Sequence, residues 1–106
     1  MKRGEFWVAR AELYASKARP VLIIQSDKVD EYASVITCLV TSYEKSDDKL
    51  RLRVEPTTDN GLETASYLMF DKIFSFDTAD LDRKIGKLDA KTMNQVDEKL
   101  KYILGL

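Results

Sequence analysis

The sequence predicts a mainly β fold of the α+β class, in which a small, strongly bent antiparallel sheet or barrel carries a C-terminal α-helix. Short apolar runs separated by polar turns fill most of the chain before residue 77, which is the pattern of a sheet with short strands. One of these runs, residues 21–24, is apolar without interruption, and this indicates a strand buried on both faces. The last part of the chain instead places its apolar residues at helical spacing.

The apolar runs predict five strands, at residues 5–13, 19–24, 35–41, 50–54 and 67–76. The second begins at Arg19-Pro20, because proline is tolerated at the first position of a strand. The fourth alternates apolar residues with Arg51 and Arg53, which is typical of a strand with one face in water. A helical turn is expected at residues 62–66, between the last two strands.

The C-terminal part is expected to be helical. Residues 78–85 are predicted to form a short helix or turn that ends at Gly86. Asp89 then caps a longer helix over residues 90–104, and Gly105 ends it. Its apolar stripe consists of Met93, Val96, Leu100 and Ile103. The stripe packs either on the molecule's own barrel or at a subunit interface, and the pattern alone does not distinguish the two.

Composition narrows the functions that the chain can perform. Its 106 residues correspond to one domain, residues 1–106, and 44% apolar content is enough for a compact core. The net charge is −1, with +3 in residues 1–19 and −4 in the remainder, so any RNA binding should be modest and salt-sensitive. No signal peptide and no apolar run near the length of a membrane span are present, which predicts a cytoplasmic protein.

Histidine is absent, which removes the commonest general acid or base and the usual histidine-containing metal sites. We therefore expect no metal and no cofactor, and chemistry that uses arginine, lysine, carboxylates, hydroxyls or tyrosine. The single cysteine, Cys38, lies inside an apolar strand and is interpreted as a small core residue.

A candidate site follows from the order of two core strands. Arg19 stands at the start of the second strand, and Thr41-Ser42 at the end of the third. In a hairpin-like arrangement these ends meet at one rim of the sheet. A cation and hydroxyls fixed on rigid strands suit the recognition of a phosphodiester.

Residues beside these strand ends are candidates for further contacts with a nucleic acid. The candidates for phosphate contacts are Ser16, Lys17, Ser42 and Lys45, and the tyrosines that could stack on bases are Tyr14 and Tyr43. The alternative for each is an ordinary solvated loop residue. Likewise, Arg19 could be a surface arginine paired with a carboxylate, and Thr41 a β-branched residue that simply suits a strand end.

The order of motifs resembles the MazF/PemK family of toxin endoribonucleases over nearly the whole chain. The matching segments are Arg3-Gly4-Glu5-Phe6-Trp7, residues 19–27, 35–42, 61–66 and 70–73, and the ending at residues 85–88 and 104–106. The resemblance implies an SH3-like barrel with an added C-terminal helix. It also implies metal-independent cleavage of single-stranded RNA, including messenger RNA, to a 2′,3′-cyclic phosphate and a 5′-hydroxyl. The expected partners are a second copy of the chain and a cognate antitoxin with a disordered acidic tail.

The resemblance also assigns roles to three residues. Arg19 matches the family's catalytic arginine, Thr41 its catalytic threonine or serine, and Asp71 an acidic position that some members use in proton transfer. Asp71 interrupts an apolar strand, so its alternative role is to pair with Lys72, Arg19 or a backbone N–H.

The chain departs from the family pattern at three places. The segment before Arg19, residues 14–18, is shorter than the family's loop, Met69 stands where some members have arginine, and Lys72 stands where glutamine is usual. These departures leave the RNA sequence preference unpredicted. Two alternatives therefore stay open: a non-catalytic toxin that resembles CcdB and binds DNA gyrase, and a degenerate toxin kept as a binding module.

Overall fold

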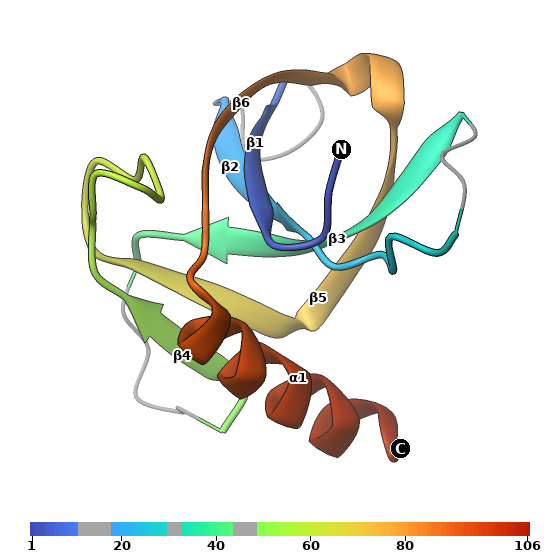
Figure 1. Cartoon of the computed structure of the whole chain (residues 1–106), viewed down its shortest axis with the longest axis vertical. Helices are drawn as coiled ribbons and strands as arrows, with labels where there is room; N and C mark the ends of the chain where they lie inside the picture. Colours follow the sequence, from blue (N-terminus) through green and yellow to red (C-terminus); the bar gives the residue numbers. More distant parts are fainter. Residues whose placement is uncertain (11–17, 30–32, 44–48) are drawn as a thin grey trace.

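A computed structural model describes residues 1–10, 18–29, 33–43 and 49–106 of the chain (Figure 1). Two parts of the sequence predictions fall outside these ranges. They are the end of the first expected strand, residues 11–13, and the candidate contact residues Tyr14, Ser16, Lys17 and Lys45.

The described residues form one strongly bent antiparallel sheet of six strands followed by a helix (Figure 1). The elements in chain order are β1 (Glu5–Ala9), β2 (Arg19–Ile23), β3 (Ser34–Thr41), β4 (Arg51–Val54), β5 (Ser66–Asp77), β6 (Leu81–Lys87) and α1 (Ala90–Leu104). The strand order is β4-β5-β3-β2-β1-β6. The sheet is therefore barrel-like but open between β4 and β6, and it confirms the predicted mainly β class with a C-terminal helix.

The segment that precedes β5 spans this opening. The Lys87 N–H of β6 donates to the Asp59 carbonyl at 2.9 Å, and Gly61 packs against the backbone of Ile85. Asn60 holds the segment in shape, because its side-chain oxygen accepts the N–H groups of Thr57 and Leu62, each at 3.0 Å. This loop therefore joins the two edges of the sheet and becomes one wall of the cavity described below.

The predictions for two segments were wrong. Residues 62–65 do not form a helical turn: Glu63 and Thr64 lie in a bend, and Ser66 is already the first residue of β5. Only Thr78–Asp80 forms a 3₁₀ turn, and Leu81–Lys87 is a sixth strand instead of part of a short helix. β6 is mostly exposed and polar, so its own sequence does not signal a strand. It forms a strand because it pairs with β1, and this pairing contains two register shifts.

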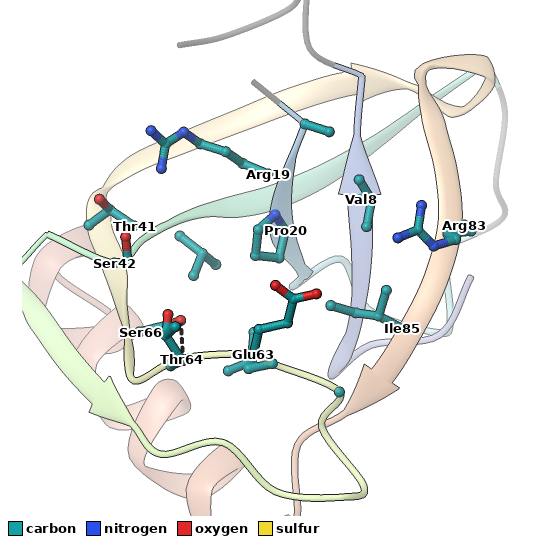
Figure 2. A pocket seen from close by; sticks show the side chains of 14 residues that line it. Val8, Arg19, Pro20, Thr41, Ser42, Glu63, Thr64, Ser66, Arg83 and Ile85 are labelled. Carbon is teal, nitrogen blue, oxygen red and sulfur yellow. Dashed lines mark hydrogen bonds between the residues drawn. The ribbon is translucent and has the colours of Figure 1, made fainter. Parts of the chain in front are cut away.

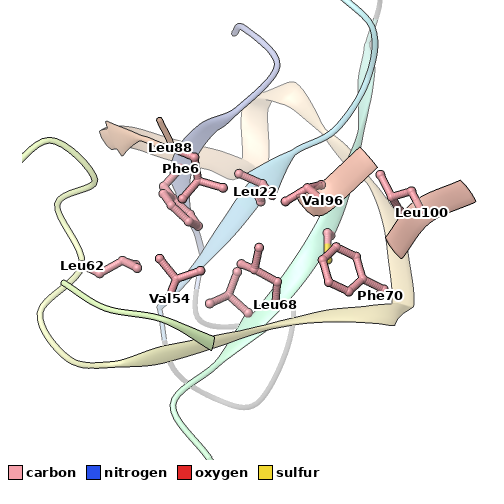
Figure 3. Close-up of a cluster of buried hydrophobic side chains, with 11 residues drawn as sticks. Phe6, Leu22, Val54, Leu62, Leu68, Phe70, Leu88, Val96 and Leu100 are labelled. Atoms are coloured by element: carbon pink, nitrogen blue, oxygen red, sulfur yellow. The ribbon is translucent and has the colours of Figure 1, made fainter. Parts of the chain in front are cut away.

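The core lies on both faces of β2 and β3. One cluster of apolar side chains fills the space under α1 and includes Leu22, Cys38 and Phe70 (Figure 3). A second cluster on the other face includes Val21, Ile23 and Val35. Successive residues of β2 thus contribute to opposite clusters, which confirms the prediction of a strand buried on both faces.

The C-terminal helix follows its prediction. α1 runs from Ala90 to Leu104, and Gly105 ends it at φ +72°, with its N–H donating to the Lys101 carbonyl. Asp89 is the N-cap residue, and a hydrogen bond with the Thr92 side chain lowers the pKa of its carboxyl. The apolar stripe packs on the molecule's own barrel, since Val96 and Leu100 are buried in the first cluster. The described part of the chain contains no helix with the length and hydropathy that crossing a membrane requires.

Cys38 is a buried core residue, as its place in an apolar strand predicted. Its Sγ lies 3.2 Å from the Met69 carbonyl, to which the thiol donates. Burial raises the pKa of this thiol to about 12, so it stays protonated at physiological pH.

Candidate functional site

A cavity of about 390 Å³ opens at the rim where β2 begins and β3 ends (Figure 2). The loop that precedes β5 forms one of its walls, and β1 and β6 form another. Apolar groups such as Val8, Pro20 and Ile85 make up part of its surface. The polar residues that line it are Arg19, Thr41, Ser42, Glu63, Thr64, Ser66 and Arg83.

The register of two strands places Arg19 beside Thr41. Val21 of β2 is opposite Leu39 of β3 at the last pair of the antiparallel ladder, and continuing that register by two residues brings Arg19 to the level of Thr41. Their side chains project into the cavity from the same side, with Ser42 next to Thr41 (Figure 2). The structure thus brings together the arginine and the hydroxyls that the order of the strands placed at one rim.

The guanidinium of Arg19 can donate further hydrogen bonds to a ligand. Its Nε atom is buried and has no hydrogen-bond partner among the described residues. No carboxylate in the described ranges forms an ion pair with Arg19 either. A buried N–H without an acceptor is unfavourable, so this side chain is suited to receive an anionic group that enters the cavity.

The hydroxyl of Thr41 is oriented by the backbone that follows it. Its Oγ1 accepts the N–H of Tyr43 at 3.1 Å, which leaves the hydroxyl proton available to a ligand. Ser42 is exposed at the same rim, and it lines the cavity. The side chain of Tyr43 is 69% exposed and does not line the cavity, so it stands at the outer edge of this region.

Asp71 lies away from the cavity. The register between β3 and β5 shifts between Cys38 and Leu39, so residues 70–72 form a bulge in β5. From this bulge the Asp71 carboxylate forms an ion pair and a hydrogen bond with Arg51, which is only 8% exposed. Its partner is therefore Arg51 of the edge strand β4, and not Lys72, Arg19 or the backbone N–H that were considered from the sequence.

Four polar lining residues were not identified from the sequence. Glu63, Thr64 and Ser66 come from the segment that was assigned to a helical turn, and Arg83 comes from the unpredicted strand β6. Ser66 donates its hydroxyl to the Thr64 carbonyl at 2.9 Å, which stiffens this wall (Figure 2). The sequence signal for three of them was the match of residues 61–66 to the family pattern, which assigned no role to Glu63, Thr64 or Ser66.

Comparisons with known proteins identify the family of this chain. Residues 2–104 match the family described as PemK-like, MazF-like toxins of type II toxin–antitoxin systems. The chain is 39% identical to a probable endoribonuclease MazF of Mycolicibacterium smegmatis, over 100% of this chain and 98% of that protein. It is 30% identical to the endoribonuclease MazF6 of Mycobacterium tuberculosis, over 93% of this chain and 98% of that protein.

Solved structures show the same fold. The Mycobacterium tuberculosis toxin MazF-mt6 superposes with a TM-score of 0.80 at 25% identity, covering 96% of this chain and 97% of that one. A mycobacterial endoribonuclease in complex with its cognate antitoxin gives a TM-score of 0.83 at 23% identity, covering 100% and 96%. A family match over nearly all residues, relatives of full length and the shared fold lead to one conclusion: the chain belongs to the PemK-like, MazF-like toxins of type II toxin–antitoxin systems.

Proposed function

We propose that this protein is an endoribonuclease that cleaves single-stranded RNA, including messenger RNA, without a metal ion. The observation that supports the proposal most directly is the open cavity in which Arg19, with its unpartnered Nε, stands beside the Thr41 hydroxyl. The endoribonuclease names of its relatives support the same reaction. A cytoplasmic location, where messenger RNA is available, stays a prediction.

The proposed reaction is an internal transesterification. The ribose 2′-oxygen attacks the adjacent phosphorus, the bond to the 5′-oxygen breaks, and one proton passes overall from the 2′-hydroxyl to the leaving 5′-oxygen. The products are a 2′,3′-cyclic phosphate and a 5′-hydroxyl. Arg19 stabilises the charge that builds on the phosphate oxygens, because its planar guanidinium can donate two parallel hydrogen bonds. Thr41 donates its free hydroxyl proton to the phosphate and holds it in line for attack.

The direct test is incubation of the purified protein with a long single-stranded RNA in the presence of EDTA. Fragments that end in a cyclic phosphate and begin with a 5′-hydroxyl are the expected result. RNA that remains intact, with and without added divalent cations, would contradict the proposal. It would direct attention to the non-catalytic alternatives, which are tested by binding to DNA gyrase.

Replacement of Thr41 by valine should lower the cleavage rate about a hundredfold, the effect of losing one well-placed donor to the phosphate. Valine keeps the β-branched shape, so the strand end should be preserved. The rate is measured with an RNA that has a single cleavage site, and the thermal unfolding temperature is measured in parallel. A rate equal to that of the wild type would return Thr41 to a purely structural role.

We propose that Asp71 acts through the fold instead of through proton transfer, because it pairs with Arg51 and does not line the cavity. Asp71→Asn should therefore keep most of the cleavage activity. It should lower the free energy of unfolding by about 1–2 kcal/mol, since a nearly buried cation loses its counter-charge. Denaturant unfolding and cleavage kinetics measure the two effects. Loss of cleavage in a variant of wild-type stability would instead place Asp71 in the chemistry.

A cognate antitoxin is the proposed protein partner. A disordered acidic tail would supply carboxylates to Arg19 and so compete with RNA for the cavity. The structure of a mycobacterial relative with its antitoxin bound supports this kind of pairing. Competition is checked by adding the antitoxin tail peptide to the cleavage assay, where an unchanged rate would contradict a shared site.

We also propose that the protein is a homodimer, joined through an exposed apolar face. Val29, Ile36, Ile73, Leu104 and Leu106 line one shallow groove where β3, β5 and the end of α1 meet. Contiguous apolar surface of this kind is typical of an interface between subunits. Light scattering at tens of micromolar should give the mass of two chains, and Ile36→Glu should give one. A monomeric mass for the wild type would contradict the dimer.

A further inference from the structure

Glu63 is an exposed carboxylate that lines a cavity otherwise suited to an anion. Among the described residues it has no hydrogen-bond or ion-pair partner, although it lines the same cavity as Arg19. A carboxylate opposes the binding of phosphate, so a site for phosphate alone would not be expected to contain one. Its presence therefore indicates a second part of the ligand, one that offers hydrogen-bond donors.

The strand register separates Arg83 from the phosphate end of the cavity. Val8 of β1 is opposite Pro20 of β2 on one side and opposite Arg83 of β6 on the other. Arg83 thus lies two strands away from β2, which corresponds to about 10 Å in a sheet. Figure 2 shows Glu63 pointing into the cavity between Pro20 and Ile85, with Arg83 beyond Ile85 and Arg19 toward Thr41.

This second end is built on well-supported backbone. Asn60 is 3% exposed, and its side chain donates to the Glu55 carbonyl at 2.8 Å and accepts the Leu62 N–H, so the chain just before Glu63 is held. The Ser66 hydroxyl fixes the Thr64 carbonyl just after it. Arg83 has one partner, Asp82, at 3.9 Å, and both side chains are more than 60% exposed, so this pair is easily exchanged for a ligand.

We infer that Glu63 and Arg83 together bind a guanine next to the cleaved phosphate. This inference rests on the proposed RNA cleavage. A guanine offers two adjacent donors, N1–H and the N2 amino group, which a carboxylate accepts side by side. Its neighbouring Hoogsteen edge offers the O6 and N7 acceptors, which arginine binds with two donors. The apolar groups of Val8, Pro20 and Ile85 contact the face of the base.

The other bases fit this pair of charges poorly. Adenine directs the N1 acceptor toward the carboxylate, and cytosine does the same with N3. Uracil supplies one donor, N3–H, where guanine supplies two. The carboxylate thus both attracts guanine and repels two of its competitors, and a difference of this kind is the basis of specificity.

The first experiment maps cleavage sites on a long RNA of mixed sequence for the wild type, Glu63→Gln and Glu98→Gln. Glu98 is an exposed glutamate on α1 outside the cavity, so its variant is the matched control. The wild type and Glu98→Gln should share a guanine adjacent to the cut. Glu63→Gln should reduce the preference for that guanine at least about tenfold. Wild-type sites without a shared guanine, or an unchanged preference in Glu63→Gln, would overturn the inference.

The second experiment changes single atoms of the RNA, so it does not depend on a variant folding. Inosine, which lacks the N2 amino group, should lower kcat/KM of the wild type about tenfold at the guanine position. 7-Deazaguanosine, which lacks N7, should lower it for the wild type but not for Arg83→Met. Equal rates for guanosine, inosine and 7-deazaguanosine with the wild type would refute the inference. If the wild type cleaves RNA at sites without guanine, only this inference fails; if it yields no cyclic phosphate, the proposed function fails as well.

Discussion

Arg19→Lys is expected to lower kcat/KM for RNA cleavage at least about a hundredfold, and Arg19→Ala about a thousandfold. Lysine keeps the charge but not the planar pair of donors, so the alanine and lysine variants separate the two contributions. The buried Nε of Arg19 lacks an acceptor in the described residues, which makes this side chain the group with most to gain from a phosphate in the cavity. Single-turnover cleavage of an RNA with one site measures the effect.

Arg53→Lys is the matched control for this change. Arg53 lies on the edge strand β4, where it pairs with Glu55 at 2.7 Å and donates to the Tyr67 hydroxyl, and it does not line the cavity. Its variant should cleave at the wild-type rate. Circular dichroism and thermal unfolding should show that both arginine variants are folded. Wild-type cleavage by Arg19→Ala would remove this residue from the mechanism.

A large loss of stability is expected for Gly86→Ala, which should lower the free energy of unfolding by about 3 kcal/mol or more. A Cβ atom at Gly86 would lie 2.3 Å from the Asn60 carbonyl carbon and 2.4 Å from the Asp59 carbonyl oxygen. Both neighbours are backbone atoms of the loop that spans the opening of the sheet, so no side chain can move aside to relieve the contact. Denaturant unfolding followed by circular dichroism gives the change.

Gly105→Ala provides the comparison for the glycine variant. Gly105 has φ +72°, yet a Cβ there would have nothing within 4 Å. Its variant should therefore cost only about 1 kcal/mol, the strain of a left-handed residue that carries a side chain. Equal stabilities of Gly86→Ala and Gly105→Ala would show that the loop can move away from residue 86 at little cost in free energy.

Because Gly61 and Ile85 line the cavity at this junction, Gly86→Ala should also reduce RNA cleavage.

Local patterns were sufficient wherever a segment's structure depends on its own residues. The helix Ala90–Leu104 was predicted to the residue, because its N-cap, apolar stripe and terminal glycine all lie within the segment. β2 was found because burial on both faces leaves an unbroken apolar run, and β3 because residues 35–40 are apolar except at Thr37. Since the ends of these two strands carry Arg19 and Thr41, one half of the cavity was predictable as well.

Patterns within short segments therefore predicted the mainly β class, the C-terminal helix and the placing of an arginine with hydroxyls at one rim. The remaining features could not be predicted from such patterns, because they depend on partners that are distant in the chain. β6 is a strand through its pairing with β1, and Asp71 faces Arg51 through a bulge set by β3. Glu63 and Arg83 reach one cavity because the Asn60 loop closes against β6, a contact between segments whose separate sequences carry no sign of it.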